Sequence, residues 1–181
     1  LRGSFLIIAT YCFIAAIAVM PIADALAIVF VEPFILLVMG KWLFDEQVGR
    51  RRITASVIGF AGVLLVIQPS FRVFGLVALF PLGTALAFAF YMLATRHLSQ
   101  RMHPVPMQLH TATLATAMCL PLLLWGHLSA QPTVALLLGP VMPEGIVWLW
   151  LVGVGVFASL SHMLITFALR FAPSATLAPL H

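Results

Sequence analysis

An acidic residue inside an apolar stretch is the first feature of this sequence that suggests chemistry. Glu32 lies near the middle of a run that holds no other charge between Asp24 and Lys41. A charge within a membrane is costly, so such acids usually face a cavity or a partner. Burial also disfavours the ionised carboxylate, so Glu32 could exchange a proton near neutral pH. The alternative is that a protonated Glu32 bonds a neighbouring helix and only stabilises the fold.

Two neighbours extend this candidate site. Pro33 has no backbone N–H and can kink a helix, which frees carbonyl groups to line a cavity. Asp24 stands where the same helix is expected to begin, so we expect it to be an N-cap, with gating or solute binding as the alternative. Asp24 and Glu32 are separated by about 12 Å along a helix, which is too far for a directly bonded acid pair.

Polar residues in later apolar stretches are further candidates for a solute or proton pathway. His110 and Thr113 are three residues apart and share a helix face, which could line an aqueous path or bond neighbouring helices. His162 could relay protons or bind solute, or it could be a buried and satisfied histidine. Tyr91 could stack on a flat solute.

The sequence gives little indication of a metal site or a cofactor site. Cys12 and Cys119 lie apart in apolar runs and form no CxxC pair, so we expect packing roles and no metal site. No motif calls for a cofactor, and the absence of a Walker A sequence leaves direct use of ATP unsupported.

The composition indicates which kind of secondary structure carries these residues. Of 181 residues, 63% are hydrophobic and 8% are charged, against about 25% charged residues in a soluble domain. The surrounding solvent must therefore be lipid, which requires helices of about 20 apolar residues. We predict an all-α membrane protein, a polytopic bundle with spans near 4–20, 22–43, 52–69, 73–95, 105–126 and 146–169 and the start of a seventh near 174. Close helix packing is expected at Gly59, Gly62, Gly83, Gly153 and Gly155.

Basic residues orient these spans. If the spans alternate, eight of the nine Lys and Arg residues fall on one side, Arg2 among them, and only Arg72 falls on the other. The positive-inside rule makes that side cytoplasmic, with the Leu1 end and the loops 44–52 and 96–104. We expect a multi-pass protein of the bacterial inner membrane, with Arg50–Arg52 near lipid headgroups and no nucleic-acid partner.

Several linked pieces resemble a known family. They are a small-residue turn with Asp24, Glu32-Pro33 within a helix, Asp45-Glu46 before the basic triplet, GFAGVLLVIQP, and a later ALRFAPSATLAP that is similar to the family's matching stretch in its second half. Together they resemble the EamA-type branch of the drug/metabolite transporter superfamily. The resemblance implies ten helices in two inverted five-helix halves. This chain then runs from about the third helix into the ninth, with residues 1–70 ending the first half and residues 71–181 beginning the second.

The sequence therefore predicts a secondary transporter, an exporter or permease, for a small organic solute such as an amino acid, a vitamin or another metabolite. Proton coupling through Glu32 is a hypothesis, and a homodimer is left open. A structural or assembly subunit is the alternative. An intramembrane enzyme is disfavoured because neither GxSG nor HExxH occurs in the sequence.

Overall fold

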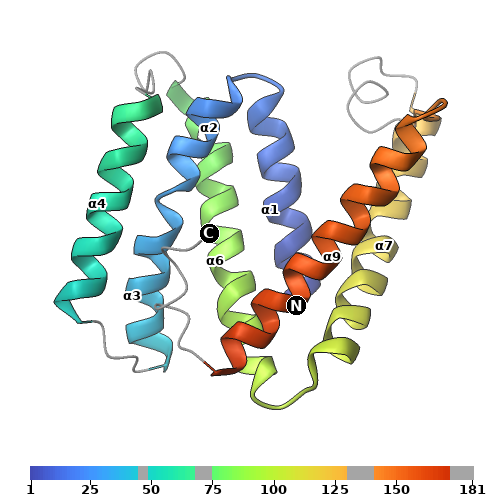
Figure 1. The fold of residues 1–181 in the computed structure, drawn as a ribbon. Helices are drawn as coiled ribbons and strands as arrows, with labels where there is room; N and C mark the ends of the chain where they lie inside the picture. Colours follow the sequence, from blue (N-terminus) through green and yellow to red (C-terminus); the bar gives the residue numbers. More distant parts are fainter. Residues whose placement is uncertain (45–48, 68–74, 130–140, 172–181) are drawn as a thin grey trace.

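The computed structural model is a bundle of helices (Figure 1). It describes residues 1–44, 49–67, 75–129 and 141–171. Four helical segments are long and apolar enough to cross a membrane, namely Ile22–Leu43, Gly75–Ser99, Pro104–Leu128 and Val147–Phe171. The expected all-α membrane bundle is thereby confirmed.

The described helices follow the order of the expected spans. They are α1 (Arg2–Ile17), α2 (Ile22–Val29), α3 (Glu32–Phe44), α4 (Arg50–Ile67), the short 3-10 helix η1 (Gly75–Ala78), α6 (Leu79–Ser99), α7 (Pro104–Leu128) and α9 (Val147–Phe171).

Two expected spans differ from the other four. At position 4–20 the structure has α1, an apolar helix of 16 residues, shorter than the roughly 20 residues that span a bilayer. At position 52–69 it has α4, whose first turn consists of three arginines. Asp45, Glu46 and the span expected to begin near residue 174 lie outside the described residues.

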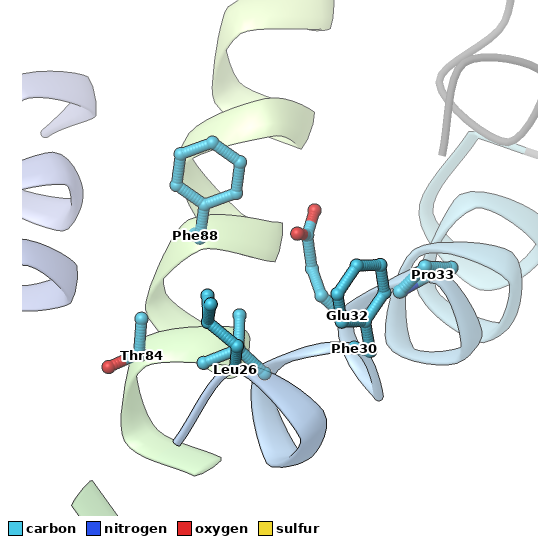
Figure 2. Close-up of a pocket in the computed structure, with 7 residues that line it drawn as sticks. Leu26, Phe30, Glu32, Pro33, Thr84 and Phe88 are labelled. Carbon is cyan, nitrogen blue, oxygen red and sulfur yellow. The ribbon is translucent and has the colours of Figure 1, made fainter. Parts of the chain in front are cut away.

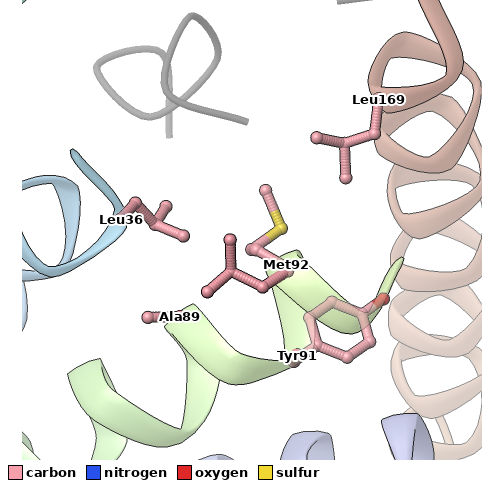
Figure 3. Packing of buried hydrophobic residues seen from close by; sticks show 6 residues of the cluster. Leu36, Ala89, Tyr91, Met92 and Leu169 are labelled. Carbon is pink, nitrogen blue, oxygen red and sulfur yellow. The ribbon is translucent and has the colours of Figure 1, made fainter. Parts of the chain in front are cut away.

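Helix α6 is the centre of the bundle. It contacts α1, α2, α3, α7 and α9, and the main buried cluster gathers around it (Figure 3). Leu36 of α3 and Leu169 of α9 reach this cluster from opposite ends of the chain, and both are fully buried. Apolar packing against α6 therefore holds early and late segments together.

The second apolar stretch is not one continuous helix. Helix α2 ends at Val29 and α3 begins at Glu32, so the helix is interrupted at residues 30 and 31. Pro33 offers no N–H to the turn before it, which explains why the helix is interrupted immediately upstream. The kink expected from Pro33 is thus a break inside a membrane-spanning segment, with Glu32 as the first residue after it.

Helix α1 approaches two neighbours closely at glycines. A Cβ at Gly3 would lie 3.1 Å from Leu114 Cδ2 of α7, and one at Gly83 of α6 would lie 3.4 Å from Cys12 Sγ. The close packing expected at Gly83 is confirmed. In the described part of the chain, a Cβ would meet no atom within 4 Å at Gly59, Gly62, Gly153 or Gly155.

Candidate functional site

A pocket opens between the α2–α3 break and α6, and Glu32 faces it (Figure 2). Its volume is about 230 Å³. The lining is apolar except for Glu32 and Thr84, and it consists of Leu26, Val29, Phe30, Glu32, Pro33, Thr84 and Phe88. The sequence predicted Glu32 and Pro33 at such a site, but not their neighbours from α6.

The Glu32 carboxyl group is buried and incompletely paired. Only 5% of the residue is exposed, and Oε1 has no hydrogen-bond partner among the described residues. Thr84 does not supply one, because its hydroxyl donates to the Phe80 carbonyl oxygen of its own helix at 3.1 Å. A buried acceptor without a donor costs about 1–3 kcal/mol. The pocket therefore favours either a proton on Glu32 or an entering group that donates a hydrogen bond.

Asp24 is not the N-cap residue of its helix. The N-cap of α2 is Pro21, and Asp24 lies in the first helical turn. The N-cap expectation is wrong because Pro21 starts the helix earlier, with a φ of −56°. A half-buried acid in the first turn still interacts favourably with the positive end of the helix dipole.

A polar cluster surrounds Arg2, which the sequence predicts only as one of the loop charges. Arg2 is 5% exposed and lies among four helices. Its guanidinium donates hydrogen bonds to neutral oxygens on α6, α7 and α9. They are Thr95 Oγ1 at 2.8 Å, the Tyr91 hydroxyl at 2.7 Å, Thr111 Oγ1 at 2.6 Å, the Met107 carbonyl at 3.1 Å, Thr166 Oγ1 at 3.3 Å and Gln108 Oε1 at 3.4 Å.

Tyr91 joins this cluster to His162 and to the Glu32 pocket. Its ring lies 4.8 Å from the Arg2 guanidinium carbon and 5.6 Å from the His162 ring. Phe88, which lines the Glu32 pocket, lies 5.4 Å from the Tyr91 ring. His162 Nδ1 is buried and has no hydrogen-bond partner in the part of the chain that the structure describes. Tyr91 and His162 thus belong to one interior group, next to the pocket.

His110 and Thr113 are placed differently. Both are exposed, and Thr113 Oγ1 donates to the carbonyl oxygens of Leu109 and His110 within α7. His110 borders a second hollow, of about 440 Å³, which Arg2 and Thr111 also line. The inward polar face of α7 is therefore formed by Gln108 and Thr111, one turn apart, and not by the expected stripe.

No group of His, Cys, Asp and Glu side chains that could hold a metal ion occurs in the described ranges. The two cysteines are free and partly buried. Among the residues that line the pocket, Glu32 alone carries an ionisable group.

Sequence comparison with known proteins finds several relatives that are longer than this chain. The chain is 31% identical to a riboflavin transporter of Vibrio cholerae over 163 residues, which are 88% of this chain and 49% of that protein. It is 25% identical to a riboflavin transporter of Brucella anthropi, covering 92% of this chain and 56% of the relative. It is also 27% identical to the pseudopaline exporter CntI of Pseudomonas aeruginosa, over 70% of this chain and 49% of the exporter.

The chain thus spans about half the length of the curated relatives it matches. No family model and no solved structure matches it. The similar proteins are bacterial transporters by name, and the present chain shares with them a segment that forms a multi-pass membrane bundle.

Proposed function

We propose that the full-length protein is a secondary transporter, an exporter or permease, of a small organic solute. The observation that carries this proposal is the pocket at the α2–α3 break, where a buried, unpaired carboxyl oxygen lies inside a membrane-spanning segment. Discontinuous helices with a charged group near the middle of the membrane are typical of solute and ion sites in transporters. The similarity to named transporters supports the same function.

The solute that fits the pocket best is a flat heteroaromatic molecule with an N–H group. Phe30 and Phe88 offer ring faces and edges beside the Glu32 carboxyl. Riboflavin, which names two of the relatives, has a flat ring system with an imide N–H. A cavity of about 230 Å³ is below the roughly 300–1,000 Å³ of sites that enclose a whole ligand. We expect it to hold the ring, with the side chain of the solute reaching beyond it.

The family we propose is the EamA-type branch of the drug/metabolite transporters. In its ten-helix plan, residues 1–70 end the first half and residues 71–181 begin the second. The matched half-length of the relatives agrees in size with such a segment. We place the protein in the bacterial inner membrane with Arg50–Arg52 near lipid headgroups, and a homodimer is compatible with this arrangement.

Proton coupling through Glu32 can be tested with the full-length protein in proteoliposomes. Wild-type protein should accumulate riboflavin in response to a pH gradient. Glu32→Gln keeps the shape of the side chain but cannot ionise, so the response to the gradient should be lost. Glu144→Gln is the matched control, since Glu144 is exposed. Transport by Glu32→Gln that follows the gradient as wild type does would refute the coupling role.

Absence of transport of any tested metabolite by the wild-type protein would instead favour the structural or assembly subunit. We do not propose an enzyme, because the pocket brings no nucleophile and base together: besides the carboxyl it offers only the Thr84 hydroxyl, which is bonded to its own helix.

A further inference from the structure

Arg2 unites four helix ends at one side of the bundle. It opens α1, and its partners lie near the end of α6, at the start of α7 and near the end of α9. The partners are 89 to 164 residues away along the chain. Farther toward the same end, Arg96 Nη1 donates to the Leu169 carbonyl oxygen at 2.8 Å. Hydrogen bonds therefore hold the helix ends together at this side of the bundle.

At the opposite side, the described part of α9 is not buried against the bundle. In α9 the buried residues are Thr166 and Leu169, both near its C-terminal end, while residues 146–152 are exposed. Figure 1 shows α9 crossing the bundle obliquely, with its C-terminal end beside the lower part of α6 and its N-terminal end away from α1. The contacts of α9 with the rest of the bundle are thus concentrated around Arg2.

The Arg2 cluster and the Glu32 pocket lie along one face of α6. Thr84 and Phe88 line the pocket, and Tyr91 and Thr95 bond Arg2. These four positions follow the spacing of i, i+4, i+7 and i+11, which places them on a single helix face. The Arg2 cluster is consequently the next layer of side chains beyond the pocket, toward the helix ends that it ties together.

We infer that Arg2 is a positioning residue that latches α7 and α9 to α1 and α6, closing the path from the Glu32 pocket to this side of the membrane. This inference rests on the proposed transport function. A transporter must open and close its two sides in turn around the site. The latch closes one side, and it must be released for solute to leave or enter there.

The chemistry of the partners suits a bond that breaks repeatedly. All six acceptors are neutral oxygens. Separating a guanidinium from a buried carboxylate would leave two uncompensated charges. Separation from hydroxyl and amide groups leaves only one charge, which water entering the open path can solvate. Arg2 can therefore hold the closed state without making the open state inaccessible.

The latch can be tested by labelling a cysteine in the pocket. Thr84→Cys is the reporter, because Thr84 is 7% exposed and lies on the α6 face beyond the latch. In a full-length protein whose Cys12 and Cys119 are replaced by alanine, a membrane-impermeant maleimide is added from the Arg2 side. Arg2→Gln should raise the labelling rate by about tenfold or more, since the loss of one charge-assisted hydrogen bond already shifts an equilibrium by about tenfold.

Three further variants make the result specific. Arg101→Gln removes an exposed arginine at the same end and should leave labelling unchanged. Arg2→Lys keeps the charge, but a point-like ammonium cannot reach three helices at once, so labelling should still rise. Thr111→Val with Thr166→Val keeps Arg2 and the side-chain volumes while removing two acceptors, and should raise labelling less than Arg2→Gln.

A folded Arg2→Gln protein whose labelling equals that of wild type would overturn the inference. If that variant does not fold, unchanged labelling in the Thr111→Val/Thr166→Val protein would do so. Labelling does not require transport. If Arg2→Gln raises labelling in a protein that transports none of the tested metabolites, the proposed function alone is refuted. If the wild-type protein transports solute and Arg2→Gln leaves labelling unchanged, the latch alone is refuted.

Discussion

Phe88 connects the two polar sites of the bundle. Its ring borders the Glu32 pocket and lies 5.4 Å from Tyr91, the residue whose hydroxyl accepts from Arg2 at 2.7 Å. A solute ring in the pocket would lie beside Phe88, since Phe88 is the aromatic residue that α6 contributes to the lining. The side chain is thus placed to contribute to affinity without being part of the proposed coupling chemistry.

We predict that Phe88→Leu weakens binding of a flat solute. Loss of an aromatic pair costs about 0.5–1.5 kcal/mol, so the KM for riboflavin should rise by up to about tenfold, with a smaller effect on the maximal rate. Phe80→Leu is the control, because Phe80 is on the same helix but 44% exposed. Equal KM values for the two variants would show that Phe88 does not contact the solute.

The two buried charges illustrate what a sequence reveals at the scale of one residue. Glu32 could be found because it interrupts a long apolar run that predicts a membrane span. Arg2 stands at the edge of such a run, where most arginines reach lipid headgroups. Its burial depends on hydroxyl groups of α6, α7 and α9, and nothing in the local sequence indicates that these distant helices meet there.

At the scale of helices, hydropathy predicted which segments form helices and their order along the chain, but not which helices contact one another. The expected spans at 73–95, 105–126 and 146–169 correspond to α6, α7 and α9 within a few residues. Which face of each helix is buried could not be predicted, since the helices are apolar nearly all round. In α7 the sequence indicated the face of His110 and Thr113 as the polar face, whereas the polar residue of α7 that is buried in the structure is Thr111.

The close approach of α1 and α7 gives a prediction at this scale. A Cβ at Gly3 would lie 3.1 Å from Leu114 Cδ2 and 3.3 Å from the Thr111 carbonyl oxygen. The backbone oxygen cannot move aside as a side-chain end can, so Gly3→Val should push the helices apart. Overpacking of this kind costs about 1–3 kcal/mol, which should lower the thermal unfolding midpoint in detergent.

Gly59→Val in α4 is the comparison, because no described atom lies within 4 Å of a Cβ there. It should leave the midpoint nearly unchanged. Equal destabilisation by both substitutions would mean that valine acts through the helix backbone and not through the α1–α7 contact.

At the scale of the whole molecule, basic residues of the described helices gather at one side of the bundle. Lys41 lies in the last turn of α3, Arg50–Arg52 begin α4, and Arg101 lies between α6 and α7. Figure 1 shows these helix ends together at the lower side of the bundle, where α9 also ends. Arg170 lies in the last turn of α9. Three arginines at the N-terminus of α4 are unfavourable for its helix dipole. Anionic headgroups would offset this cost, which favours a negatively charged membrane surface at that side.

We therefore predict that the lower side faces the cytoplasm. Single cysteines replace exposed residues of the full-length protein: Lys41 and Arg101 on the lower side, and Leu76 and Met142 on the other. Cys12 and Cys119 are replaced by alanine. In intact spheroplasts an impermeant maleimide should label Leu76→Cys and Met142→Cys, while Lys41→Cys and Arg101→Cys should react only after the membrane is opened. The reverse pattern would invert the topology, and it would place the Arg2 latch on the outer side of the transport path.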